Sequence, residues 1–323
     1  MSLKRVVASL KKHDNFLITA HTNLEGDALG AELGFFMLLK KLGKNAIIVN
    51  EDSVPYGYEF MPGLENIKRF NNKPNWKVDF DCFVALDCSD LRRTGEVYKL
   101  NTQHKHTINI DHHISNERFG DVNWVDAHTS SASEMVYHIY KEMNVRFDRD
   151  SALCLYVGML TDTGSFRYSN TTSVTHKAAA ELLKFGLNVP ELYNHAYGNI
   201  PFQDAKLLIK ILPGIRRQAQ GKIIWFQVKQ NILRNKKIYL DLTDQLLSFA
   251  RLIRGVEVAV LFKENLGVKD EVRINFRSNG KVDVNAIAKA FGGGGHRTAS
   301  GATVHGKIDV IRKRVLAKIK EVL

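Results

Sequence analysis

Short apolar runs alternate with longer amphipathic segments through the first half of the chain. Phe16 to Ala20 is apolar and β-branched, which predicts a strand. The apolar spacing from Ala28 to Leu42 predicts a helix that ends at Gly43. Two more apolar runs, Phe80 to Leu86 and Thr107 to Ile110, predict strands. Strands that alternate with helices indicate an α/β fold, with a mostly parallel sheet covered by helices on both faces.

Acidic or imidazole side chains follow each of the three predicted strands. His21 follows the first strand, Asp87 follows the second, and Asp111, His112 and His113 follow the third. Ligands of open parallel sheets bind beyond the carboxyl ends of the strands, where loops converge over a rigid platform. The sequence therefore predicts a site at this edge of the sheet.

The segment from 129 to 143 predicts an amphipathic helix, with Thr129 or Ser130 as its N-cap. The apolar run from 151 to 160 is too short for its period to distinguish a helix from a buried strand, but it leads to Asp162. Further helices are expected over residues 173–184 and 203–211.

Beyond residue 215 the pattern changes to alternating strands, expected over Lys222–Val228, Val256–Phe262 and Glu271–Arg277. Asp283 can cap a helix that runs to Phe291. The length of 323 residues favours two domains. We expect one over residues 1–190, a linker over 191–215, and a smaller α/β domain over 216–323.

Composition narrows the class of protein. Hydrophobic residues at 44% and charged residues at 25% exclude a disordered or fibrous chain. The net charge of +12 favours a polyanionic partner, such as a nucleotide or nucleic acid. Three cysteines are too few and too odd in number for a disulfide framework, which favours the reducing cytoplasm. The sequence shows neither a signal peptide nor the roughly 18 consecutive apolar residues of a spanning helix, so no membrane association is expected.

Three potential metal ligands, His21, Glu25 and Asp27, lie within one seven-residue loop around a turn glycine. Taken alone, this loop is better explained by an N-cap and a surface histidine. Together with Asp87, His112 and Asp162, however, it supplies more ligands than one ion can use. Two cations about 3.5–4 Å apart can share carboxylates and promote phosphoryl displacement. Carboxylate-rich sites favour Mn²⁺ or Mg²⁺.

The paired histidines are expected to have different roles. Adjacent side chains on extended backbone point to opposite sides. One of His112 and His113 could therefore bind metal, while the other contacts a phosphate or acts as a general acid. Asp111 remains a further candidate beside them.

A glycine run, residues 292–295, precedes His296 near the end of the chain. Backbone N–H groups of such a run can bind a phosphate, although a flexible turn that stops a helix explains it equally simply. The nearby Arg273, Arg277 and Arg297 favour anion binding.

The order of these motifs resembles the DHH phosphoesterases. The matching segments are His21-x-x-x-Glu25-Gly-Asp27, Asp87 after a strand, Asp111-His112-His113, Asp162-Thr-Gly, Asn116-x-x-Phe119-Gly-Asp121, Ser131-x-Ser133-Glu134 and the final Gly-Gly-Gly-Gly-His296. The last motif resembles the DHH-associated domain, and the resemblance spans residues 15 to 305. Within the family the chain is similar to the bacterial nanoRNase branch, which hydrolyses short oligoribonucleotides and 3′-phosphoadenosine 5′-phosphate.

The resemblance implies a role for each matching residue. Two Mn²⁺ ions are implied, with Mg²⁺ or Co²⁺ as substitutes: one would be held by His21, Glu25, Asp87 and Asp162, the other by Asp27, Asp87, His112 and Asp162. His113 would face the scissile phosphate, with Asp111 as a second catalytic candidate. Across a cleft, the terminal phosphate and base would be held by Arg277, Ser278, Gly293, Gly294, Gly295 and His296.

One motif departs from the family pattern. The family usually has Pro-Asp-Gly-Asp where this chain has Leu24-Glu25-Gly26-Asp27, and Glu25 is longer by one methylene.

Several functions stay open at this point. The expected substrates are short RNA oligonucleotides, from dinucleotides to about five nucleotides, and mononucleotides that bear two phosphates. The alternatives are a phosphodiesterase for cyclic dinucleotides or linear diadenylate, a single-strand DNA exonuclease, a manganese pyrophosphatase, and a nucleotide-binding module without turnover. A homodimer is also an option.

Overall fold

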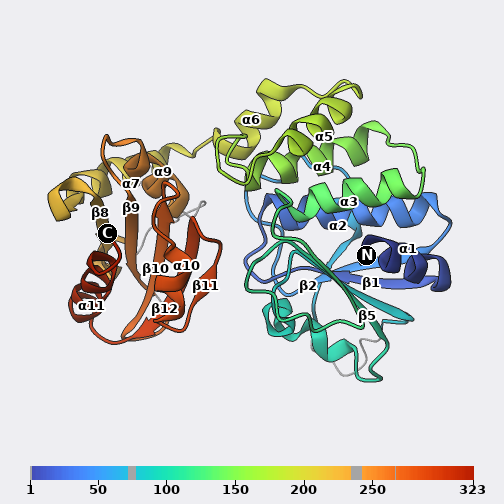
Figure 1. Cartoon of the computed structure of the whole chain (residues 1–323), viewed down its shortest axis with the longest axis horizontal. Helices are drawn as coiled ribbons and strands as arrows, with labels where there is room; N and C mark the ends of the chain where they lie inside the picture. The colour runs from blue at the N-terminus through green and yellow to red at the C-terminus, as the bar shows by residue number, and fades with distance from the viewer. Residues whose placement is uncertain (1, 72–77, 234–241, 266) are drawn as a thin grey trace. The chain divides into compact units, whose positions relative to one another are not determined.

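The computed structural model describes residues 2–71, 78–233, 242–265 and 267–323. The chain divides into two compact units, Met1–Asn199 and Ile200–Leu323 (Figure 1). Within the described part of the chain, no helix combines the length and the apolar character that a membrane crossing requires. All three cysteines are buried and unpaired.

The first unit is built around a parallel sheet. Its strands are β1 (Asn15–Thr19), β2 (Asn45–Asn50), β3 (Ile67–Arg69), β4 (Cys82–Leu86), β5 (His106–Asp111) and β6 (Val122–Val125). Its helices are α1 (Ser2–Lys12), α2 (Gly26–Lys41), α3 (Ala132–Glu142), α4 (Arg149–Asp162), α5 (Ser173–Leu183) and α6 (Val189–Tyr197), with the 3₁₀ helices η1 (Leu64–Asn66) and η2 (Leu91–Leu100). The strand order is β3-β2-β1-β4-β5-β6. The order reverses between β1 and β4, so the loops after these two strands diverge and leave room for a ligand there.

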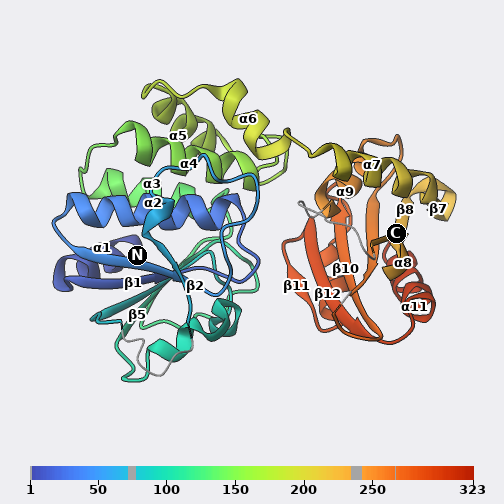
Figure 2. The ribbon, with the colours of Figure 1, turned by 180° about the vertical axis from the view of Figure 1, so that it is seen from behind.

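Both faces of this sheet are covered, which confirms the predicted fold class. Phe16 and Ile18 of β1 pack with α1 to α5 in the larger core, whereas Leu17 points to the other face, where η2 packs. Figures 1 and 2 show α2 to α5 along one side of the sheet. Because both faces are covered, the three central residues of this strand, Phe16, Leu17 and Ile18, are all apolar.

Two helices of this unit resolve or correct the sequence interpretation. The ambiguous run 151–160 is helical, and α4 begins with a capping box between Asp148 and Ser151. The N-cap of α3 is Ser131, whose hydroxyl accepts a hydrogen bond from the N–H of Glu134, so the expected cap at Thr129 or Ser130 is wrong. The hydroxyl of Ser130 instead donates to the carboxylate of Glu134 and does not cap the helix.

The second unit contains a mixed sheet with the order β11-β12-β10-β9-β8-β7. Its strands are β7 (Arg216–Gln218), β8 (Ile223–Val228), β9 (Val258–Glu264), β10 (Glu271–Ser278), β11 (Gly294–Gly295) and β12 (Ala299–His305). Its helices are α7 (Phe202–Ile211), α8 (Gln230–Leu233), α9 (Thr243–Leu252), α10 (Val284–Lys289) and α11 (Ile308–Lys320), with η3 (Leu212–Gly214) and η4 (Ala219–Gly221). The stretch from 191 to 215 therefore contains most of α6, all of α7 and η3.

The alternation predicted for β10 is present. Val272, Ile274 and Phe276 are buried under α10 and α11, and Arg273 on the opposite face is exposed. Residues of β8 and β9 on that opposite face pack against α7 and α9. Asp283 caps α10 as expected, since its carboxylate accepts hydrogen bonds from the N–H groups of Asn285 and Ala286.

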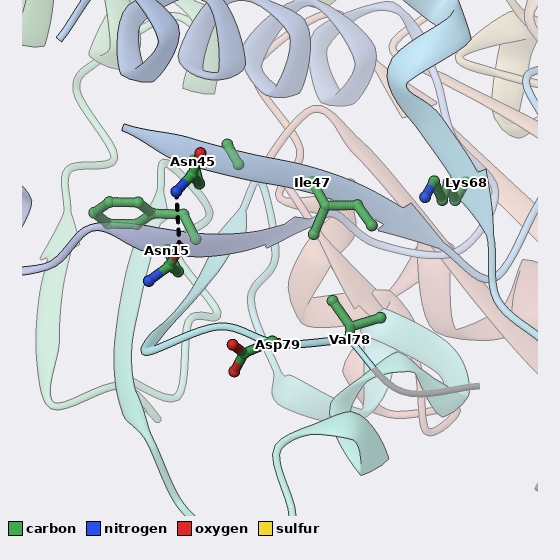
Figure 3. Close-up of a pocket in the computed structure, with 8 residues that line it drawn as sticks. Asn15, Asn45, Ile47, Lys68, Val78 and Asp79 are labelled. Atoms are coloured by element: carbon green, nitrogen blue, oxygen red, sulfur yellow. Dashed lines mark hydrogen bonds between the residues drawn. The ribbon is translucent and has the colours of Figure 1, made fainter. Parts of the chain in front are cut away.

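A pocket of about 230 Å³ lies at the amino ends of β1 and β2 (Figure 3). Its walls include Asn15 and Asn45, whose side chains share a 3.0 Å hydrogen bond. Since Asn15 is the first residue of β1 and His21 follows the last, this pocket and the predicted site lie at opposite ends of the strand.

Candidate active site

Asp87 is the centre of a cluster at the carboxyl ends of β1, β4 and β5. Its Oδ2 lies 3.3 Å from Nε2 of His21, and its Oδ1 lies 3.3 Å from Nε2 of His112. Nε2 of His112 is also 3.7 Å from Asp27 Oδ2 and 3.9 Å from Asp162 Oδ2. Three strand ends and the end of α4 therefore bring together residues that are up to 141 positions apart in the sequence.

Asp87 belongs to three groups of potential ligand atoms. It forms one of them with Asp111 and His113, and the other two contain only the predicted metal ligands. One consists of His21, Glu25 and Asp87, and the other of Asp27, Asp87 and His112; within each group the atoms lie within 4.8 Å of one another. A carboxylate shared between two sets of ligands is the arrangement that a pair of divalent cations uses.

The backbone at Asp87 is unusual for a residue with a side chain. Its φ angle is +52°, in the left-handed region. The N–H of Asp87 nevertheless continues the sheet by donating to the carbonyl of Ile110 at 3.0 Å. This turn directly after β4 holds the carboxylate over the sheet edge, and strained backbone of this kind is commonest at functional sites.

Asp27 is fixed from the opposite side by the start of α3. The N–H groups of Ala132 and Ser133 donate to its two carboxylate oxygens at 2.7 and 2.9 Å. Gly158 of α4 makes this approach feasible, because a Cβ there would lie 1.9 Å from Ser133 Oγ and 2.9 Å from Asp27 Oδ1. The helix N-terminus stabilises the charge of the carboxylate and fixes its direction.

Glu25 differs from the other ligand candidates in being exposed. It is the N-cap residue of α2, and its side chain is 58% exposed. Its Oε1 still reaches to within 3.9 Å of His21 Nε2. The longer side chain therefore reaches the cluster from the solvent side.

The residues present fit a divalent cation. Asp87 Oδ1 is buried and has no hydrogen-bond partner among the described residues, although ring nitrogens of His112 and His113 lie 3.3 and 3.5 Å away. Nδ1 of His21 donates to the carbonyl of Thr22 at 2.8 Å, so Nε2 is the ring nitrogen directed at the cluster, and it can bind a cation once it loses its proton. A mixed set of carboxylate oxygens and imidazole nitrogens is suited to Mn²⁺, Fe²⁺ or Zn²⁺.

Burial and neighbouring charges shift several pKa values here. Burial alone would lower the pKa of His21, but the hydrogen bond and charge of Asp87 raise it to about 9. Burial raises the pKa of Asp27 to about 6, and the charge of Asp87 adds to the effect. Burial also keeps the pKa of Asp162 well above its usual range. Asp87 is the opposite case, because its contacts with His112 and His21 hold its pKa well below the usual range despite burial. A cation can bind these groups only when they lose their protons, so its affinity for the cluster must depend on pH.

His113 is held by Asp111. Its Nδ1 lies 2.7 Å from Asp111 Oδ1, and Asp111 is fully buried at the end of β5. Burial would raise the pKa of Asp111, but the charge of His113 and the hydrogen bond to it lower that pKa, so Asp111 is an ionised acceptor and His113 Nδ1 is the donor.

The expectation that the side chains of His112 and His113 point in opposite directions is only partly confirmed. Both rings approach Asp87 Oδ1, because the strand ends at Asp111 and the two histidines lie on the loop beyond it.

Sequence reasoning missed three polar residues around the cluster. The side-chain amide of Asn170 donates to Asp162 Oδ2 at 3.1 Å and to the carbonyls of Asp162 and Ser130. Glu32 is buried in α2 and accepts from Asn50 at 2.8 Å, and burial raises its pKa to about 8. Asn116 was noted only as part of a motif, yet it donates to Asp111 at 2.6 Å. For Glu32 the sequence offered one indication, which is that an acidic residue interrupts the apolar face of a predicted helix.

The candidates of the second unit lie around β10, β11 and β12. Arg277 Nη2 donates to Asp244 Oδ1 at 2.6 Å. The hydroxyl of Ser278 is buried and donates to the carbonyl of Val282 at 2.7 Å. Gly294 and Gly295 form the edge strand β11 beside β12, and the N–H of Gly293 donates to the carbonyl of Ala288. The N–H of His296 donates to Ala299 across a tight turn. The glycine run is therefore an ordered strand and turn.

The glycines permit close packing here. A Cβ at Gly293 would lie 2.0 Å from the carbonyl oxygen of Gly301, and Gly295 has a φ of +137°. Neither position accepts a larger residue without a shift of the backbone.

The parallel sheet with a cluster of potential metal ligands at its switch point suits a hydrolase of phosphoester bonds, and comparison with known proteins shows this class. Residues 15–159 match the DHH family, N-terminal domain, and residues 237–321 match the DHHA1 domain. The chain is 30% identical, over 99% of its length and 94% of the relative, to the bifunctional oligoribonuclease and PAP phosphatase NrnA of Thermus thermophilus. The chain belongs to the DHH family of phosphoesterases.

A second relative and one solved structure are also similar to this chain over nearly its whole length. The NrnA protein of Bacillus subtilis is 28% identical over 93% of this chain and 92% of its own length. An exopolyphosphatase-related protein from Bacteroides fragilis has the same fold, with a TM-score of 0.89 over 99% of this chain and 96% of that chain, at 23% identity. The similarity therefore includes both units.

Proposed function

We propose that this enzyme hydrolyses short oligoribonucleotides, from dinucleotides to about five nucleotides, to mononucleotides, and 3′-phosphoadenosine 5′-phosphate to AMP, with two Mn²⁺ ions. The observation that carries the proposal is the Asp87 carboxylate, which is shared by two sets of ligand atoms. The names of the Thermus and Bacillus relatives support both substrate classes.

Each ligand candidate has a place in this proposal. His21, Glu25, Asp87 and Asp162 would hold one ion, and Asp27, Asp87, His112 and Asp162 would hold the other. Bound divalent cations lower the pKa of water and neutralise charge on a phosphoryl group. Asp27 is directed by the start of α3 and Asp162 by Asn170, so both carboxylates are oriented before a ligand arrives.

His113 would supply a proton to the oxygen that leaves. Its Nδ1 is bonded to Asp111, so Nε2 is the ring nitrogen available to a substrate. During hydrolysis the water oxygen forms a bond to phosphorus and the bond from phosphorus to the ribose oxygen breaks. The leaving oxygen takes the proton from Nε2 of His113, and the proton of the water passes to solvent.

The second unit would bind the substrate. We assign the terminal phosphate and base to Arg277, Ser278, Gly293, Gly294, Gly295 and His296. Arg277 is half-buried and already paired with Asp244, which holds its guanidinium in one orientation. The hydroxyl of Ser278 donates to the carbonyl of Val282 and its N–H donates to the carbonyl of Thr298, so Ser278 would contribute by shaping the turn beside Arg277.

Product analysis by chromatography tests the proposal. Metal-stripped enzyme is incubated with and without Mn²⁺ on a 5′-phosphorylated diadenylate, on 3′-phosphoadenosine 5′-phosphate, on a cyclic diadenylate and on a long RNA. We expect Mn²⁺-dependent AMP from the first two substrates and slow cleavage of the long RNA. Faster turnover of the cyclic dinucleotide would favour the cyclic-dinucleotide phosphodiesterase instead. Binding without turnover of any substrate would indicate a nucleotide-binding module.

Two variants of one helix control this experiment. Asp162→Asn removes a proposed ligand at the end of α4, and Asp150→Asn makes the same change at an exposed position near its start. Loss of turnover in the first variant alone ties the activity to the cluster. Equal activity of the two variants would contradict the site.

A further inference from the structure

Asn116 lies behind Asp111, on the loop that follows the two histidines. Its side-chain N–H groups face three acceptors: Asp111 Oδ2 at 2.6 Å, Asn109 Oδ1 at 2.8 Å and the carbonyl of Cys88 at 3.1 Å. Its own N–H donates to the carbonyl of His113 at 3.2 Å. Asn116 is therefore bonded to both members of the Asp111–His113 pair.

Asn109 anchors this arrangement to the sheet. It is fully buried in β5, and its side-chain amide donates to the carbonyls of Cys88 at 2.9 Å and Ala85 at 3.4 Å. Its Oδ1 is thereby left to accept from Asn116. A continuous chain of hydrogen bonds leads from the end of β4 through Asn109, Asn116 and Asp111 to the ring of His113.

Asn116 has a second, purely local contact. Its Oδ1 accepts from the N–H of Arg118 at 2.7 Å, which closes a turn two residues on. An aspartate at position 116 retains this acceptor but loses the donors toward Asp111. The two contacts can therefore be separated by substitution.

We propose that Asn116 is a positioning residue, which acts through Asp111 to aim the imidazole of His113 at the leaving oxygen of the substrate. The inference rests on the proposed function of His113. Asp111 has two carboxylate oxygens, and with Asn116 bonded to one of them the other is fixed toward His113 Nδ1. Without this donor the carboxylate can rotate, and Nε2 of His113 loses its direction.

Two substrates with different leaving groups distinguish a positioning role of Asn116 from a structural one. The ribose oxygen of a diadenylate needs a proton when its bond to phosphorus breaks, whereas p-nitrophenolate leaves without one. We therefore compare kcat for the diadenylate with kcat for the p-nitrophenyl ester of thymidine 5′-monophosphate. Asn116→Ala and Asn116→Asp should lower kcat at least about 10-fold on the diadenylate and less than about 3-fold on the p-nitrophenyl ester.

Asn123→Asp is the matched control. Asn123 lies opposite Asn109 in the register of β5 and β6, is half-buried as Asn116 is, and closes its own turn by accepting from the N–H of Gly120 at 2.9 Å. Its kcat should equal that of the wild type on both substrates. Mn²⁺ affinity, measured by isothermal titration, should be unchanged in all three variants.

Three outcomes would overturn the inference. Restored activity of Asn116→Asp beside an impaired Asn116→Ala would assign Asn116 to the turn alone. An equal loss on both substrates would show a general disturbance of the site. A wild type that turns over neither substrate with Mn²⁺ would contradict the proposed function, and this inference with it.

Discussion

The two units of the molecule differ in charge and in the chemistry of their polar residues. The first unit carries 22 Lys and Arg against 24 Asp and Glu, and the second carries 24 against 10. The net charge of +12 thus originates entirely in the second unit. In the first unit a few of the acids, among them Glu25, Asp27 and Asp111, gather around Asp87, whereas in the second the basic residues are spread over strands and helices.

This difference separates two tasks that a phosphoesterase must combine. Concentrated carboxylates bind cations but repel an anionic substrate. A strongly basic unit in the same chain offsets that repulsion and raises the local concentration of polyanions. We therefore expect changes in the first unit to act on metal binding and turnover, and changes in the second to act on KM.

Asp87→Ala should have the largest effect. Its carboxylate is the one shared by both groups of ligand atoms, so both cation positions should be lost. Loss of a residue that merely orients a metal ligand lowers activity by about 10- to 100-fold. Loss of the shared ligand itself should therefore lower turnover by more than about 100-fold. The measurement is kcat on a diadenylate at saturating Mn²⁺. Asp79→Ala, which changes an exposed acid at the opposite edge of the sheet, should leave kcat unchanged.

Gly158→Ala should disrupt the same unit from inside its core. The added Cβ would lie 1.9 Å from Ser133 Oγ, so α3 or α4 must move and Asp27 must lose its helix N-terminus. Overpacking of this kind costs about 1–3 kcal/mol of the free energy of unfolding. Thermal unfolding and Mn²⁺ titration would both detect it. Gly214→Ala, where a Cβ meets nothing within 4 Å, should change neither; a normal Mn²⁺ affinity in Gly158→Ala would contradict this account.

Arg277→Ala changes the second unit and should therefore affect substrate binding. Losing a charge-assisted hydrogen bond to a phosphate costs about 1.5–3 kcal/mol, so KM for a diadenylate should rise about 10-fold or more while kcat changes little. Arg273→Ala, four residues earlier on β10 and exposed, is the control and should change KM by less than about 3-fold. A fall in kcat that equals the rise in KM would contradict the proposal that the first unit determines turnover and the second determines KM.

Glu32→Gln should have the smallest effect on turnover, and it should be visible only in how the free energy of unfolding depends on pH. Burial raises the pKa of Glu32 to about 8 from an ordinary value near 4.5, so the folded chain holds more protons than the unfolded chain between those values. Stability must therefore fall as pH rises through this window, by at most about 1.4 kcal/mol per pH unit. Urea unfolding at pH 5 and pH 8 should show a smaller decrease for Glu32→Gln than for the wild type. An equal decrease in the free energy of unfolding of both proteins would show that Glu32 does not hold the additional proton.

The sequence was sufficient for the elements that position the site. The runs that end at His21, Asp87 and Asp111 are strands, and parallel pairing brings their ends to one edge, as their alternation with helices indicated. The start of α3 was misplaced because Thr129, Ser130 and Ser131 are all capping residue types. Only the contact between Ser130 and Glu134 decides among them.

Residues that act on the site across long sequence distances could not be predicted. Gly158 and Ser133 are important because α4 packs against α2 and α3, and Asn170 is important because its loop returns to the end of α4. Neither the period nor the spacing of the sequence contains that information. The shared approach of His112 and His113 to Asp87 was also hidden, because it depends on the strand ending one residue before them.

Mn²⁺ stoichiometry tests the central claim, that Asp87 joins two cation positions in the first unit. Metal-stripped wild type, Asp87→Ala and Asp79→Ala are dialysed against Mn²⁺, and bound metal per chain is measured by elemental analysis. We predict two ions per chain for the wild type and Asp79→Ala, and fewer than one for Asp87→Ala. A wild type that holds one ion or none, or an Asp87→Ala variant that still holds two, would contradict the claim.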